Sequence, residues 1–149
     1  MPVEIVRKKA AGTFSNRELK RIALTVLELV GQSQAELSVA LVNNREIRKL
    51  NAKYRQKDYP TDVLSFAAAN GLPIDVRLLG DVVISVEKAK EQAKQRGRTL
   101  NQETVTLLIH GILHLLGYDH ERSAKDARTM GRLEKKIYRT LCEERILRV

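Results

Sequence analysis

All three histidines of the chain lie within residues 110–120, which read His110-Gly111-Ile112-Leu113-His114-Leu115-Leu116-Gly117-Tyr118-Asp119-His120. His110 and His114 are four residues apart, so a helix would place both imidazoles on one face. A continuing helix would carry His120 about 9 Å further along the axis and away from that face. Gly117 removes this difficulty, because glycine readily adopts the left-handed conformation that ends helices. The stretch therefore predicts a helix, a glycine turn and a three-histidine metal site.

The number of predicted ligands favours a catalytic site, since three protein ligands leave one coordination position open. Zinc is the first choice of divalent ion because three imidazoles and a water complete its preferred tetrahedron, although nickel, copper and iron also accept imidazole. Two alternatives stand beside this interpretation. A histidine on an apolar helix face can simply be a hydrogen-bonded core residue. Cys142 could supply a fourth ligand, but a lone thiol in another helical segment is more often a small hydrophobe.

The composition is that of a globular protein, and 149 residues predict a single domain over 1–149. No apolar run approaches the roughly 20 residues that span a bilayer, and the N-terminus lacks the apolar region of a signal peptide. One cysteine suits a reducing compartment, so we expect a cytoplasmic protein without membrane contact. The net charge of +9 favours RNA or DNA as partner, although a solvated basic surface would give the same count. With 4% aromatic residues, charge more than stacking is expected to hold a nucleic acid.

Strand and helix patterns are intermixed along the chain. Apolar patterning predicts strands at 3–6, 37–42, 63–66 and 79–85. Capping boxes at Ser15 and Thr99 open two helices, the second of which carries the histidine pair. Further helices are predicted from Asn43 or Asn44 to Tyr54, over 86–96 and over 123–147, and residues 54–62 are predicted to form a loop. The pattern predicts an α+β fold, with a small mixed sheet covered by helices.

The histidine spacing nearly matches H-E-x-x-H-x-x-G-x-x-H, the ligand motif of the metzincin peptidases. Gly111 occupies the position of the glutamate that serves those enzymes as general base. Glycine cannot accept a proton, so peptide hydrolysis is disfavoured, and a short uncharged residue suits an anionic substrate better. A base could come from Asp119, Glu121 or another nearby carboxylate.

Two further blocks precede the histidine stretch: Tyr54-Arg55-x-Lys57-Asp58-x-Pro60-Thr61-Asp62-Val63-Leu64-Ser65-Phe66 and Gly80-Asp81-Val82-Val83-Ile84-Ser85. In this order the three blocks closely resemble the YbeY family of bacterial metal-dependent endoribonucleases. The resemblance runs over essentially the whole chain, and one departure is Ala67, where the family usually has proline. It implies a zincin-like fold, a zinc-type ion on His110, His114 and His120, and Arg55 as an essential catalytic arginine.

The resemblance also implies the substrate and its setting. A YbeY-like protein would cut single-stranded RNA, form the 3′ end of small-subunit rRNA and act in quality control of ribosomal particles. A guanidinium such as Arg55 suits bidentate phosphate binding and can stabilise charge in the transition state. From charge alone, Lys57, Arg48 and Lys53 are further candidates for RNA contacts. Asp58 or Asp62 is expected to hold Arg55 in place.

Two other functions remain open at this point. One is a non-catalytic ribosome-assembly or RNA-binding factor that a metal stabilises, and the other is a zinc metallopeptidase-like hydrolase. The sequence leaves open the native metal, the general base, the choice between water and the ribose 2′-OH as nucleophile, and the oligomeric state.

Overall fold

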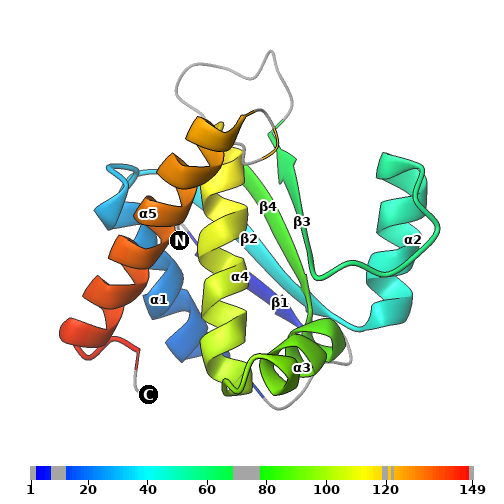
Figure 1. Ribbon diagram of the computed structural model, residues 1–149, viewed down its shortest axis with the longest axis horizontal. Helices are drawn as coiled ribbons and strands as arrows, with labels where there is room; N and C mark the ends of the chain where they lie inside the picture. The colour runs from blue at the N-terminus through cyan, green and yellow to red at the C-terminus, as the bar shows by residue number, and fades with distance from the viewer. Residues whose placement is uncertain (1–2, 8–12, 69–77, 119–120, 122, 148–149) are drawn as a thin grey trace.

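A four-stranded mixed sheet lies at the centre of the fold (Figure 1). The structure is a computed structural model that describes all residues except 1–2, 8–12, 69–77, 119–120, 122 and 148–149. The strands follow one another in the spatial order β1 (Val3–Arg7), β2 (Glu36–Val42), β4 (Leu78–Ser85) and β3 (Val63–Ala67). β1, β2 and β4 are parallel, and β3 pairs with β4 in the antiparallel sense. The predicted α+β class with a mixed sheet is confirmed.

Helices begin where the sequence places its capping residues. Ser15 and Thr99 form the two predicted capping boxes, in which each hydroxyl accepts from the backbone N–H three residues further on. The Asn43 side chain accepts in the same way from the backbone N–H of Glu46.

None of the helices in the described ranges combines the length and apolarity needed to cross a membrane. The helices are α1 (Asn16–Leu29), α2 (Asn44–Arg55), α3 (Val86–Gln95), α4 (Leu100–Leu115) and α5 (Ala124–Glu143).

The two faces of the sheet are covered unequally, and β4 shows how the sequence divides them. Side chains alternate along a strand, so Val82 and Ile84 point to one face and Val83 to the other. Val82 and Ile84 belong to the main core, with α4, α1 and α5. Val83 joins a smaller cluster with Ile47 of α2 and Leu64 of β3. Figure 1 shows α4 along one face of the sheet with α5 beside it, while α2 lies beyond β3.

Two predicted boundaries are wrong, and each error has a physical cause. Arg55 was expected in a loop, but it is the last residue of α2, which Gln56 ends in a left-handed conformation with φ of 56°. The final helix was predicted to reach Leu147, but it ends at Glu143. Arg145 turns the chain with φ of 57°, and Leu147 then packs back into the core, where it is 1% exposed. A buried leucine after a turn gives the same apolar signal as one in a continuing helix.

Candidate active site

The histidine pair lies on one face of α4, as predicted. The rings of His110 and His114 have centroids 4.8 Å apart and meet edge to face at 66°. α4 ends at Leu115, and Gly117 follows with φ of 96°, in the conformation expected of a helix-ending glycine. His120 and Asp119 lie outside the described residues. The described part of the predicted metal segment therefore has the helix and the turn, with two imidazoles side by side.

Gly111 brings this helix close to the sheet. A Cβ at Gly111 would lie 2.6 Å from Cγ1 of Val82 and 3.2 Å from Oγ of Ser65. The Ser65 hydroxyl also donates to the Gly111 carbonyl oxygen over 3.0 Å. A glutamate at position 111 would need the helix to move away from β3 and β4. The position of the metzincin base is thus taken by a close helix–strand contact, which gives a structural reason for its absence.

Arg55, on the last turn of α2, is held over β3. Its Nη2 donates to the backbone carbonyl of Ser65 over 2.8 Å, and its guanidinium carbon lies 5.5 Å from the centroid of the Phe66 ring. Ser65 therefore contacts Arg55 through its carbonyl and α4 through its hydroxyl. A guanidinium has five N–H donors, so the bond to Ser65 leaves others for an anion.

The expectation that Asp58 or Asp62 holds Arg55 is wrong. Asp58 pairs instead with Arg48, whose Nε donates to Oδ1 over 2.9 Å. The hydrogen bond and the positive charge of Arg48 lower the pKa of Asp58, and Asp58 in turn raises the pKa of Arg48. Asp62 accepts from the backbone N–H of Val63 and from the side chain of Gln92. Proximity in the sequence therefore does not predict which carboxylate pairs with an arginine in the folded chain.

The loop between α2 and β3 is fixed to its surroundings. Asn51 is 2% exposed, and its side-chain amide donates to the carbonyl of Tyr59 over 2.9 Å. The backbone carbonyl of Asn51 accepts from the backbone N–H of Lys57, and the backbone carbonyl of Asp62 accepts from the backbone N–H of Ser85. A polar residue on the buried face of an amphipathic helix was the signal in the sequence that could have identified Asn51 as such an anchor.

One cleft of about 1020 Å³ brings the predicted catalytic groups together. His110, His114, Arg55 and Lys57 all line it, as does Glu121, one of the predicted candidates for the base. Arg48 and Lys53 instead line a separate cavity of about 590 Å³ on another side of α2, together with Asp58. The structure therefore divides the four predicted RNA contacts into two groups.

Aromatic side chains are concentrated in the same cleft. Three of the six aromatic residues in the sequence, Tyr54, Tyr59 and Phe66, line it. Tyr54 and Tyr59 are 51% and 52% exposed, so their rings are accessible to a ligand. A low aromatic content had argued against stacking, but composition does not show where the few rings gather.

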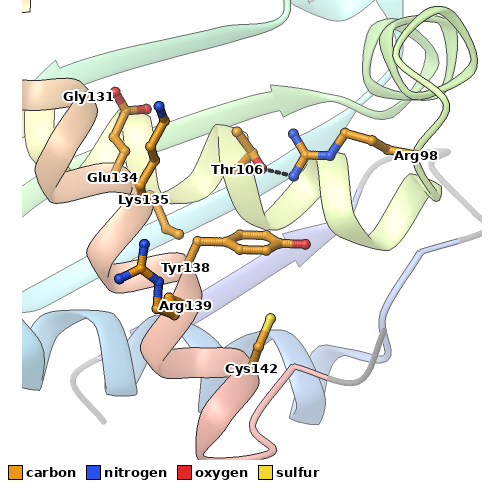
Figure 2. A pocket seen from close by; sticks show the side chains of 9 residues that line it. Arg98, Thr106, Gly131, Glu134, Lys135, Tyr138, Arg139 and Cys142 are labelled. Carbon is orange, nitrogen blue, oxygen red and sulfur yellow. Dashed lines mark hydrogen bonds between the residues drawn. The ribbon is translucent and has the colours of Figure 1, made fainter. Parts of the chain in front are cut away.

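The donor set fits a transition metal as far as the structure describes it. Two imidazoles on adjacent helical turns, at the wall of a solvent-accessible cleft, are suitable nitrogen ligands. Within the described residues, no three histidine, cysteine or acidic side chains form a metal-binding group, and the third predicted ligand lies outside them. Cys142 lines a different cavity, between α4 and α5, where burial raises the pKa of its thiol (Figure 2). The structure does not bring this thiol to the histidine cleft.

Comparison with known proteins gives a consistent result over nearly the whole chain. Residues 4–142 match the family described as Endoribonuclease YbeY. An Endoribonuclease YbeY of a Sulfurihydrogenibium species is 48% identical over 131 residues, which cover 87% of this chain and 86% of the relative. An Endoribonuclease YbeY of Anaeromyxobacter dehalogenans is 46% identical over 93% of this chain and 71% of the relative. The solution structure of TM1509 from Thermotoga maritima is similar with a TM-score of 0.66 and 31% identity, over 96% of this chain and 91% of that one.

Proposed function

The chain belongs to the Endoribonuclease YbeY family, and from this premise we propose that it is a metal-dependent endoribonuclease that cuts single-stranded RNA. The observation that carries the proposal is the shared cleft. Arg55 comes from α2 and the histidine pair from α4, yet they line one cavity large enough for a nucleotide. A phosphate placed there would meet a guanidinium and a pair of metal-ligating side chains together.

In this proposal His110, His114 and His120 hold one divalent ion, with zinc as first choice and nickel or another transition metal as alternatives. When bound, the ion would supply Lewis acidity that polarises a phosphoryl oxygen and lowers the pKa of water. Three neutral ligands leave its positive charge undiminished, which suits a phosphodiester substrate.

The chain's own side chains would bind and orient the phosphate. Arg55 would bind non-bridging oxygens in a bidentate manner and stabilise the charge that grows in the transition state. Its bond to Ser65 and its contact with Phe66 fix the guanidinium before substrate arrives, which lowers the cost of orientation. Lys57 would add positive charge at the same cleft, and Glu121, which also lines it, would accept a proton from the nucleophile.

Single-stranded RNA suits the cleft because its unpaired bases are free to stack. Tyr54 and Tyr59 offer exposed rings next to Arg55 and Lys57. Arg48 and Lys53, on the other side of α2, would attract the flanking backbone by charge alone. The physiological substrate in this proposal is rRNA within ribosomal particles, at the 3′ end of the small-subunit RNA.

The test is cleavage of end-labelled RNA by protein whose metal content has been measured. Chelated protein should lose activity, and stoichiometric zinc should restore it on a single strand but not on the matching duplex. His114→Ala, prepared in the same way, should bind less metal and lack cleavage, whereas Cys142→Ala should match the wild type in metal content. Equal cleavage by His114→Ala would indicate a contaminating nuclease. A fully metallated wild type that binds RNA without cutting it would favour the assembly-factor alternative.

A further inference from the structure

Glu134 on α5 contacts the predicted metal ligand His110. Its Oε2 lies 3.2 Å from Nδ1 of His110, and each side chain is 25% exposed. His110 lines the catalytic cleft, whereas Glu134 lines the cavity of about 610 Å³ between α4 and α5. Figure 2 shows Glu134 on the same helix as Tyr138 and Cys142, at the wall of this second cavity. The carboxylate thus contacts the imidazole from a cavity other than the cleft.

We propose that Glu134 is a positioning residue that prepares His110 to bind metal through Nε2. A neutral imidazole carries its proton on one nitrogen and a lone pair on the other. A carboxylate at Nδ1 accepts a hydrogen bond, so the proton belongs on Nδ1 and the lone pair on Nε2. The same bond fixes the rotation of the ring. Carboxylates that bond the second nitrogen of a metal-bound histidine generally have this effect.

The apolar packing between α4 and α5 indicates that this contact is not needed simply to join the helices. Met130, Ile137 and Leu141 of α5 are buried in the main core, with 0%, 3% and 0% exposure. A partly exposed polar pair adds little to a contact that such residues already make. The contribution of Glu134 should therefore be seen in metal binding more than in folding.

Zinc affinity is the first measurement, made by competition with a chromophoric chelator and without RNA. Glu134→Leu removes the acceptor and the charge but keeps much of the volume, and it should weaken zinc binding about 10- to 100-fold. Glu134→Gln keeps an acceptor oxygen and should lie between Leu and the wild type. Glu143→Gln is the matched control because it removes the same charge from the exposed end of the same helix, and it should leave affinity unchanged. Equal losses of zinc affinity in the Gln and Leu variants would show that Glu134 acts only through its negative charge. That result would overturn the positioning role.

The tautomer of His110 is the second measurement, and a purely structural role would not change it. In metal-free wild type at about pH 8, correlations between ring nitrogens and ring protons should show His110 in the Nδ1–H form. Glu134→Leu should shift the population towards Nε2–H, while the apo melting temperature stays close to that of the wild type. An Nε2–H form in the wild type, or unchanged zinc affinity in Glu134→Leu, would overturn the proposal. If Glu134→Leu does not fold, zinc affinity and the His110 tautomer are both measured on Glu134→Gln.

The inference rests on the proposed metal site, but the two can fail separately. Zinc binding that depends on Glu134 in a protein without RNA cleavage would leave the positioning role intact and contradict the nuclease. Metal-dependent cleavage by a protein whose zinc affinity does not change in the Glu134 variants would support the nuclease and contradict the positioning role.

Discussion

The two sides of α2 are both basic, yet they differ in what lies beside them. On one side Arg55 and Lys57 line a cleft that also contains the imidazoles of α4. On the other side Arg48 and Lys53 line a smaller cavity, where Arg48 is paired with Asp58. Positive charge attracts any phosphate backbone, but of these two sides only the first would bring a phosphate to the proposed metal ligands. The difference shows that charge alone identifies a partner class, and that the neighbouring chemistry identifies the site.

The largest effect should come from reversing the charge on the cleft side. Arg55→Glu should lower the cleavage rate about 100- to 1000-fold, the usual cost of losing a donor to transition-state charge. The change in unfolding free energy should stay below about 1 kcal/mol, because an exposed arginine adds little to a core. Arg21→Glu on α1 makes the same charge change at another exposed position and should keep the wild-type rate. Equal losses in both variants would mean that net charge, not the cleft, determines activity.

A smaller effect should follow from a substitution at the close contact between α4 and β4. Gly111→Ala places a Cβ against Val82, and we expect a loss of about 1–3 kcal/mol in unfolding free energy from overpacking. The matched control is Gly131→Ala on α5, where a Cβ meets nothing within 4 Å and helix propensity favours alanine. Chemical denaturation of both variants gives the comparison. A neutral Gly111→Ala would show that α4 does not depend on this close contact.

The smallest effect is expected on the outer side of α2. Because Arg48 lowers the pKa of Asp58 in the folded chain, the pair stabilises the protein above the carboxyl's ordinary pKa of about 3.9. This contribution is lost as the pH falls through the lowered folded value. Asp58→Asn should therefore melt slightly below the wild type at neutral pH, and the gap should close in acid. Repeating the scan in an Arg48→Gln background should remove the difference; a gap that persists there would assign it to something other than the pair.

The local signals in the sequence predicted much of the fold. Ser15 and Thr99 capped the helices as expected, and Gly117 turned the chain after the histidine pair. These features depend on residues within a few positions of each other, so a single sequence contains all the information they need. The sheet order and the pairing of β3 with β4 depend on contacts between distant segments and were not predicted.

The parts of the site that the sequence did not reveal are contacts with no local signature. Arg55 binds the backbone carbonyl of Ser65, a group that every residue possesses, so nothing in the side chains indicated it. Glu134 is 24 residues from His110 and lies among other charged residues on α5. Asp58 was assigned to Arg55 because it was near in sequence, whereas the α2 geometry brings it to Arg48.

The central claim is that Arg55 and the histidine pair act on the same phosphate in one cleft. The most direct test is the rate of RNA cleavage by wild type, Arg55→Glu, His114→Ala and the double variant, with metal content measured in each. Groups that act as a unit show strongly non-additive losses. We therefore predict that the double variant is no slower than the slower single variant. Losses that multiply in the double variant would show that Arg55 and His114 contribute independently and would contradict a shared site.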